Sequence, residues 1–409
     1  MNVKHILFVH YGDDWIRGSE RCLIDLVSTL DKRQYQPYVW TNSPALHAEI
    51  KKLGVHSELS QFPILFGWKA PRYDFSGWRS LVRDAKDYIE RADIDLVHVN
   101  SAAPCQWMCR AAKSMSIPLV TQLHSDYPTR DRITLGIHSS PHIIAVSDAV
   151  TDHLIEDGYP LERLSVIRNG LDIQRLAHQD SVPAKRTLDI CNNSYLFATV
   201  GSLIHRKGID RLLSALRHVT LEYPHAHLLI IGDGPLRKKL EQQAEALHLG
   251  QHVHFVGEQE HVLGWLKNCD CFISGAREEA FGLVVTEAAL AGLPIIAPNQ
   301  GGIPEIIEHM RTGILYKNTG IKPMVEAMRA VVKNRSAARA MGVRAKAHIQ
   351  NHYTIEMNAR NIESVYCKLL AGHGARSLSV WRSLRPLKTY LARQIHSSLP
   401  NSALSKESI

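Results

Sequence analysis

The sequence lacks any long hydrophobic run. No apolar stretch approaches the roughly 18 residues that a membrane-spanning helix needs. The apolar part of residues 1–9 is too short for a signal peptide, so we expect a first buried strand there. Seven cysteines, an odd number scattered over 409 residues, do not suit a disulfide framework, and we expect reduced thiols in a cytoplasmic protein. Internal repeats and low-complexity segments are also absent from the sequence.

The net positive charge of the body of the chain is small. The formal net charge is +8, but six basic residues and one acidic residue lie after residue 370, which leaves only +3 for the rest. No basic stripe typical of nucleic-acid-binding modules is present, so nucleic acid is not an expected partner. The tail, residues 371–409, is a candidate amphipathic contact to an anionic membrane surface. A flexible tail, or a helix docked on the body, is the alternative. On the expected helical face lie Leu387, Tyr390, Leu391 and Ile395, with Lys388 and Arg393 off it.

Short apolar runs alternate with helical patterns along most of the chain, which predicts an α/β fold with parallel sheets covered on both faces. The length favours two domains. The predicted strands are His5–His10, Gln36–Thr41, Leu96–Asn100, Leu119–His124, His142–Ser147, Tyr195–Gly201, Ala226–Ile231, Val253–Val256, Cys271–Ser274, Pro294–Ala297 and Gly313–Tyr316. The predicted organisation is a domain over 1–172, a polar connection over 173–194, a second domain over 195–352, a helix over 353–370 and the tail.

Two glutamates eight positions apart enclose a glycine and a predicted helix start. The segment from Glu279 to Glu287 predicts a loop and a short helix, followed by a turn and a buried strand. Gly282 permits close approach of the backbone to a ligand, and the unpaired N–H groups of the helix start suit a phosphate. The carboxylates repel phosphate but suit the hydroxyls of a sugar or ribose. The segment therefore predicts a nucleotide-sugar site, and a structural glutamate pair is the alternative.

A second loop places two adjacent cations after a predicted strand. Arg206 and Lys207 lie at the tip of the loop that ends at Gly208, before a predicted helix from Ile209. A diphosphate leaving group gains negative charge as its bond to a sugar breaks, so a cation here stabilises the transition state more than the ground state. A solvated basic loop is the alternative. The later turn at residues 232–236 is not the G-x-G-x-x-G dinucleotide fingerprint.

Six motifs follow one another in order between Tyr195 and Ile307. They are G-x-L-x-x-x-K-G, G-D-G-P-L, F-V-G, E-x-F-G-L-V-x-x-E-A, G-L-P-I-I-A and G-G-I-P-E-I. This order resembles the retaining glycosyltransferase family 4. The resemblance implies the GT-B fold, two facing Rossmann-like doubly wound domains with a cleft between them. Weaker matches in the first half are Gly18–Glu20, Val97–Ser101, Thr121–His124, Ala145–Asp148 and Val166–Asp172.

The resemblance also implies residue roles. The catalytic residues would be His124, Lys207, which would neutralise the donor diphosphate, and Glu279, which would bind hydroxyls of the transferred sugar. The implied donor-binding residues are Gly18, Ser202, Arg206, Lys207, Gly257, Glu258, Glu279, Phe281, Gly282, Leu283, Val284 and, on the ribose, Glu287. Gly301, Gly302 and Glu305 would border the cleft, although a helix cap is the alternative for Glu305. No cofactor or metal is expected, and the pairs His225/His227 and His252/His254 are expected to be strand residues, since no third ligand is evident.

Two positions depart from the family pattern. Ser202 stands where relatives often have an arginine, and we hypothesise that Arg206 compensates. The loop Gly12–Gly18 lacks the adjacent glycine pair usual in relatives, which leaves its role open. His124 is expected to end a strand, where a neutral imidazole can donate to a sugar hydroxyl or polarise the forming bond. A structural histidine is the alternative.

An aromatic-rich stretch, residues 62–78, is a candidate acceptor platform that includes Lys69 and Arg72. Packing of a long loop is the alternative. The predicted function is retaining transfer of a sugar from a nucleotide-sugar to a glycan or lipid-linked acceptor, in cell-surface polysaccharide synthesis. The predicted location is the cytoplasm, with the tail as the candidate contact to the inner face of the membrane. The alternatives are a sugar-nucleotide epimerase of the same architecture and a catalytically weak relative that binds a glycan or a partner.

Overall fold

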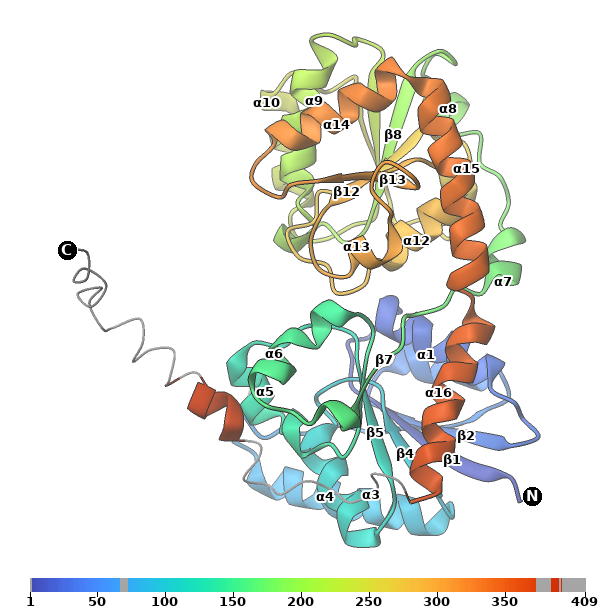
Figure 1. The fold of residues 1–409 in the computed structure, drawn as a ribbon, viewed down its shortest axis with the longest axis vertical. Coiled ribbons are helices and arrows are strands. Elements are labelled where there is room, and N and C mark those ends of the chain that lie inside the picture. Colours follow the sequence, from blue (N-terminus) through green and yellow to red (C-terminus); the bar gives the residue numbers. More distant parts are fainter. Residues whose placement is uncertain (1, 67–72, 373–383, 390, 392–409) are drawn as a thin grey trace, which may run out of the picture. The chain divides into compact units, whose positions relative to one another are not determined.

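Two parallel sheets organise the chain in the computed structural model, which describes residues 2–66, 73–372, 384–389 and 391. Each sheet belongs to one of two compact units (Figure 1). The first unit consists of Met1–Ile167 and Arg360–Ile409, and the second unit consists of Arg168–Ala359. The prediction of an α/β protein with two Rossmann-like domains is confirmed.

The first sheet has seven strands in the order β3-β2-β1-β4-β5-β6-β7. Its centre is apolar, and Ile6, Leu7, Phe8 and Val9 of β1 are fully buried. The order reverses direction between β1 and β4, and open α/β sheets bind ligands at this switch point, beyond the carboxyl ends of the strands. The strands are β1 (Lys4–His10), β2 (Tyr35–Thr41), β3 (His56–Leu59), β4 (Leu96–Val99), β5 (Leu119–Leu123), β6 (Ile143–Ala145) and β7 (Leu164–Val166). The helices are α1 (Gly18–Thr29), α2 (Pro44–Lys52), α3 (Phe75–Arg91), α4 (Cys105–Met115), α5 (Thr129–Thr134) and α6 (Asp152–Glu156).

The second sheet repeats this topology with six strands, in the order β10-β9-β8-β11-β12-β13. Its switch point lies between β8 and β11. The strands are β8 (Tyr195–Val200), β9 (Ala226–Ile231), β10 (Val253–Gly257), β11 (Cys271–Ile273), β12 (Ile295–Pro298) and β13 (Gly313–Tyr316). The helices of this unit are α7 (Ile173–Ala177), α8 (Ala184–Thr187), α9 (Ile209–Thr220), α10 (Arg237–Ala246), α11 (Val262–Leu266), α12 (Leu283–Leu290), α13 (Ile303–Ile306), α14 (Lys322–Lys333) and α15 (Arg335–His352). The last helix in this series, α16 (Ile355–Leu370), begins in the second unit and continues into the first, which resumes at Arg360.

The eleven predicted strands all form, with ends that agree to within two residues. The short strands β3 and β7 were not among the predictions, because each has too few residues for a clear alternation. After β6 the chain forms a 3-10 turn at Asp148–Val150, and α6 follows it. The sequence pattern thus locates the sheets well, and the short elements at their edges less well.

The segment 173–194 differs from the predicted interdomain connection, because the structure places it inside the second unit. It contains α7 and α8 and is tied to that unit by specific bonds. The Val182 amide donates to the Gly264 carbonyl (3.1 Å), and the Lys185 ammonium lies 2.8 Å from the Asp270 carboxylate. The unit boundary lies at Ile167 instead of residue 172, since the amide of Leu171 donates to the carbonyl of Tyr353 (2.8 Å).

No helix within the described ranges is long and apolar enough to cross a membrane. The predicted membrane-contacting tail lies largely outside the described residues. Its described part includes Arg385, whose guanidinium donates to the carbonyl of Gly158. The exposed leucines Leu384, Leu387 and Leu391 also belong to it. Membrane contact by the tail stays a prediction.

Candidate active site

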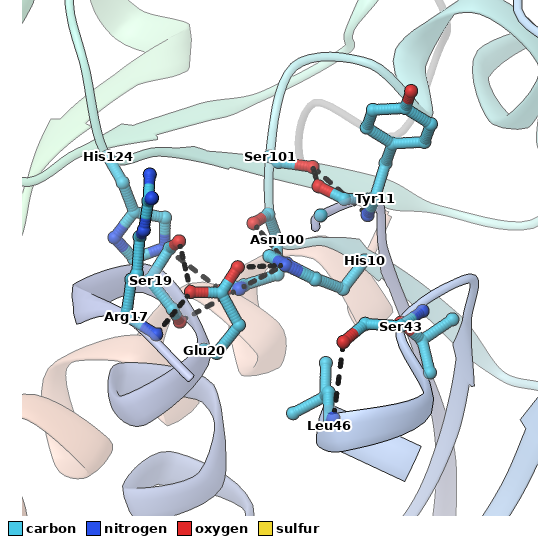
Figure 2. Close-up of polar contacts among 12 residues, drawn as sticks. His10, Tyr11, Arg17, Ser19, Glu20, Ser43, Leu46, Asn100, Ser101 and His124 are labelled. Atoms are coloured by element: carbon cyan, nitrogen blue, oxygen red, sulfur yellow. Dashed lines mark hydrogen bonds and ion pairs between the residues drawn. The ribbon is translucent and has the colours of Figure 1, made fainter. Parts of the chain in front are cut away.

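Polar side chains gather at the switch point of the first sheet (Figure 2). His10 ends β1, Asn100 follows β4, and His124 follows β5. Because these parallel strands are neighbours, their carboxyl ends bring the three residues to one edge of the sheet. Glu20, in the first turn of α1, completes the group, and we call these four residues the switch-point network.

Glu20 and His10 form a buried hydrogen-bonded pair. Nε2 of His10 lies 2.8 Å from Oε1 of Glu20, while Oε2 of Glu20 accepts bonds from the Arg17 amide (3.0 Å) and the Ser19 hydroxyl (3.1 Å). Burial acts to raise the pKa of Glu20, but the hydrogen bond and the charge of His10 outweigh it and lower that pKa to about 2. Glu20 is therefore a carboxylate at neutral pH.

Asn100 connects this pair to His124. Its carbonyl and its side-chain amide both lie 3.1 Å from Nδ1 of His10, and its Oδ1 lies 3.0 Å from Nε2 of His124. Burial, together with the charge on His10, lowers the pKa of His124 to about 4 against the opposing effect of Glu20. His124 is therefore neutral at pH 7, and a neutral ring has one nitrogen that donates and one that accepts a hydrogen bond.

The loop after β1 is held close to this network. The amide of Gly12 donates to Oδ1 of Asn42 (3.0 Å), and Nδ2 of Asn42 donates back to the Gly12 carbonyl (2.9 Å). A Cβ at Gly12 would lie 2.7 Å from both Glu20 and His10, so a side chain does not fit there. Gly18 begins α1 and is exposed. Its predicted contact with the donor stays a prediction.

Lys207 and Glu279 come together at the switch point of the second sheet. Lys207 ends the short 3-10 turn His205–Lys207 after β8, and Glu279 lies in the loop after β11. Nζ of Lys207 lies 2.6 Å from Oε2 of Glu279. Both side chains are less than one-fifth exposed, at 19% and 16%. The two residues that the sequence assigned to the diphosphate and to the sugar are therefore direct neighbours.

Arg206 is placed differently from Lys207. Its guanidinium donates to the carbonyl of Glu278 (3.1 Å) and lies 3.9 Å from Oε2 of Glu279, at the limit of an ion pair. Its side chain is 43% exposed. Ser202, two residues after β8, is half-buried and gives its carbonyl to the Ile204 amide (2.9 Å). Compensation for Ser202 by Arg206 stays a hypothesis, because Arg206 is less buried than Lys207.

A clamp joins the loops that carry Lys207 and Glu279. The guanidinium of Arg277 binds both carboxylate oxygens of Asp210 (2.8 and 2.6 Å) and donates to the carbonyl of His205 (2.8 Å). At Gly208 the backbone has φ of +63°, and a Cβ would lie 1.9 Å from the Gly275 carbonyl oxygen. Only glycine lets the two loops approach so closely.

The helix after Glu279 begins as predicted. Gly282, with φ of +110°, is the N-cap of α12, and this left-handed conformation favours glycine. Leu283 and Val284 form the first turn and are half-buried, so their amides belong to the helix start. Phe281 is buried and points its ring toward that of Tyr353, 6.2 Å away. The Phe281 side chain therefore packs in the interior, and only the Phe281 backbone is left to make the predicted contact with the donor.

The remaining predicted residues lie around the same edge of the second sheet. Glu287 is half-buried in α12. Gly257 ends β10 and accepts a bond from the Gly232 amide (2.7 Å), and Glu258 after it is exposed. The Glu305 carboxylate forms an ion pair with Arg168 (2.8 Å), so it has a partner within the protein and needs no ligand to balance its charge. Gly302, by contrast, donates its amide to the Glu279 carbonyl (3.1 Å) and so supports the site.

The candidate acceptor platform divides into two parts. Phe62 is buried against Trp40 and Trp107, which agrees with the packing alternative. Tyr73 and Phe75 are exposed. Lys69 and Arg72 lie outside the described residues. Within the described part of the chain, no group of three or more histidines, cysteines and acidic residues is arranged to hold a metal ion.

Sequence reasoning missed the roles of five residues, which are His10, Glu20, Asn100, Asp210 and Arg277. Glu20 and Asn100 do fall within motifs that carry the family resemblance. The available signal was their position directly after a strand or at a helix start, where polar residues of α/β folds face ligands.

Comparison with known proteins agrees with this geometry. The family described as "Glycosyltransferase Family 4" matches residues 16–175, and that described as "Glycosyl transferases group 1" matches residues 184–348. The chain is 26% identical over 311 residues to the N-acetyl-alpha-D-glucosaminyl L-malate synthase of Bacillus anthracis, covering 73% of this chain and 80% of the relative. It is 24% identical to a GDP-mannose-dependent monoacylated alpha-(1-6)-phosphatidylinositol monomannoside mannosyltransferase of Corynebacterium glutamicum, covering 86% and 94%.

Solved structures show the same fold. Anabaena Alr3699/HepE in complex with UDP and glucose superposes with a TM-score of 0.76 at 22% identity, covering 90% of this chain and all of that one. A glycosyltransferase from Rickettsia africae ESF-5 gives 0.77 at 19% identity, covering 91% and 99%. With both sheets in Rossmann-like order and both halves matched, this chain belongs to the GT4-type glycosyltransferases and has the α/β GT-B fold.

Proposed function

We propose that this protein transfers a sugar from a nucleotide-sugar to a glycan or lipid-linked acceptor, with retention of the anomeric configuration and without a divalent metal. The single observation that carries the proposal is the contact between Lys207 and Glu279 (2.6 Å) at the second switch point, next to the loop that leads into α12. It combines a cation, a hydroxyl acceptor and a helix start. These are the groups that a diphosphate joined to a sugar requires.

Each group has a separate task in the proposed reaction. The Lys207 ammonium and the first amides of α12 bind the diphosphate, and their attraction grows as the bond between the sugar carbon and the phosphate oxygen breaks. Glu279 accepts hydrogen bonds from sugar hydroxyls, and Glu287 from the ribose. The acceptor oxygen attacks from the face that the diphosphate leaves, and its proton passes to the departing phosphate oxygen. Charge on the leaving group is met by protein cations, so the step needs no metal.

The relatives support the substrate class. The names of the relatives from B. anthracis and C. glutamicum describe an N-acetylglucosaminyl-malate synthase and a GDP-mannose-dependent enzyme. Alr3699/HepE was solved with UDP-glucose. The nucleotides and sugars in these names differ, so the proposal specifies the nucleotide-sugar class of donor and not one base or one sugar. The relatives described are transferases or share their fold, and no observation supports the epimerase alternative.

A panel of UDP- and GDP-linked sugars tests the proposal. We expect slow release of nucleotide from at least one donor without an acceptor, with a rate unchanged by EDTA. Release that stops with EDTA contradicts the metal-free step. Binding of a donor without any turnover, with or without lipid-linked acceptors, supports the alternative of a catalytically weak binding protein.

Three variants test the role of the cations. Lys207→Ala should lower kcat/KM by about 100-fold or more, since removal of one preorganised charge-stabilising donor costs about 3 kcal/mol. Arg206→Ala tests compensation for Ser202, and an unchanged kcat/KM excludes that role. Lys267→Ala is the matched control, because Lys267 is exposed and precedes β11, and so lies near the amino-terminal end of that strand, away from the site.

A further inference from the structure

The side-chain amide of Asn100 has a defined orientation. Its Nδ2 lies 3.3 Å from the carbonyl oxygen of Ser19, and a carbonyl oxygen only accepts hydrogen bonds. The nitrogen of the amide must therefore face Ser19. Its oxygen then faces the ring of His124, 3.0 Å from Nε2 (Figure 2).

The orientation of Asn100 determines which nitrogen of His124 carries the proton. An amide oxygen only accepts, so Nε2 of His124 must be the donor. A neutral imidazole carries one proton, and Nδ1 is then an unprotonated acceptor. Among the described residues Nδ1 has no hydrogen-bond partner. The neutral state follows from burial, which with the charge on His10 lowers the pKa of His124 to about 4 despite Glu20.

Glu20 and His10 hold Asn100 from the other side. The Glu20 carboxylate fixes His10 through Nε2 (2.8 Å), and Nδ1 of His10 contacts both the carbonyl and the side-chain nitrogen of Asn100 at 3.1 Å. His10 thus has a partner on Asn100 in either protonation state: the carbonyl when Nδ1 carries a proton, and the side-chain nitrogen when it does not. All three residues are buried, which excludes water as a competing partner.

We propose that Asn100, held by His10 and Glu20, is a positioning residue that fixes His124 as the Nε2–H tautomer and makes its Nδ1 a hydrogen-bond acceptor for a hydroxyl group of the acceptor or the transferred sugar. The inference rests on the proposed function for the identity of that hydroxyl. It narrows the expected role of His124, because a ring that presents Nδ1 accepts from a hydroxyl and does not donate to it. Asn100 acts here as the orienting carboxylate does in a catalytic triad.

The tautomer can be measured without activity. The full chain is labelled with 15N-histidine, and His124 is assigned by the signals lost in His124→Gln. We expect Nε2 protonated and Nδ1 unprotonated in the parent chain and in Asn100→Asp, which keeps an acceptor at the same place. Asn100→Leu should populate the Nδ1–H form. A protonated Nδ1 in the parent, or an unchanged tautomer in Asn100→Leu, overturns the inference.

Kinetics provide the second readout. Asn100→Leu should lower kcat by about 10- to 100-fold, as loss of an orienting partner does at comparable sites, with a smaller change in KM. Asn100→Asp should recover most of that loss. Ser101→Ala is the control at the next residue, since its hydroxyl contacts the backbone of Tyr11 and not His124. If Asn100→Asp is as slow as Asn100→Leu, the hydrogen-bond acceptor is not what matters. A failure of every donor to turn over contradicts the proposed function but leaves the tautomer measurement valid.

Discussion

Replacing His138 with phenylalanine is expected to make the first unit more resistant to acid. His138 lies in the 3-10 turn Ile137–Ser139, is 1% exposed, and packs edge-on against Tyr159. Neither ring nitrogen has a hydrogen-bond partner among the described residues, although Nε2 lies 3.3 Å from the Asp157 carboxylate. Phenylalanine therefore keeps the ring contact and removes no described hydrogen bond.

The magnitude follows from the pKa of His138. Burial lowers this pKa from its usual 6.5 to about 4; Asp157 opposes the shift, whereas Arg132 and Arg385 add to it. Because the folded value is the lower one, the unfolded chain binds the proton first as the pH falls. Stability is lost from about pH 6.5 down to about pH 4, to a limit of about 3.4 kcal/mol. At pH 5.5 the loss from His138 alone is about 1.4 kcal/mol relative to pH 7.5.

Hydrogen exchange of the β5 and β6 amides in urea reports the free energy of unfolding of this unit. Between pH 7.5 and 5.5, His138→Phe should lose about 1.4 kcal/mol less than the parent chain. His56→Gln, at an exposed position of β3, is the control for removing an imidazole from the same unit. An equal loss in His138→Phe and the parent would refute the reasoning, because His138 would then be charged already in the folded protein.

Three further predictions concern the two switch points. Gly208→Ala should lower the free energy of unfolding by about 2 kcal/mol or more and should also reduce kcat/KM. The reason is that φ is +63° and the new Cβ would overlap the Gly275 carbonyl. Thermal unfolding measures the loss of stability, and donor hydrolysis measures the change in kcat/KM. Arg277→Leu breaks the clamp to Asp210 and should lower the free energy of unfolding by less than about 1 kcal/mol, because the ion pair is partly exposed. The same change should lower kcat/KM by about 10-fold, since it misplaces Lys207. Glu20→Gln should cost about 3 kcal/mol in urea unfolding at pH 7, because its folded pKa of about 2 lies below the usual 4.5; this contribution is present above pH 4.5 and is lost as the pH falls toward 2.

Local sequence is enough to locate the strands and the loops that follow them. Lys207 and Glu279 were both predicted as site residues, because each lies in a loop whose own composition is informative. Their contact follows from the pairing of β8 with β11, which no local pattern reveals. The sequence therefore predicts which loops carry chemistry better than it predicts which side chains meet.

The switch-point network shows the limit of that reasoning. His10 and Asn100 are 90 positions apart, and they meet because β1 pairs with β4. Each residue alone reads as an ordinary polar residue after an apolar strand. His124 was predicted as functional, but its partner Asn100 was not, because a hydrogen bond between neighbouring strand ends depends on register. Register is a property of the folded sheet and not of either segment.

Helix α16 has a consequence for synthesis of the chain on the ribosome. The first unit ends at Ile167 and resumes at Arg360, so its last helix is made after the whole second unit. Until then His98 lacks the Tyr366 hydroxyl that lies 2.6 Å from its Nδ1. At about 5–20 residues per second, the wait from Ile167 to Leu370 is roughly 10–40 s. During that interval the first sheet is complete but lacks the cover of α16, so the first unit is exposed to chaperones and proteases. A chain truncated before α16 should remain exposed to them permanently.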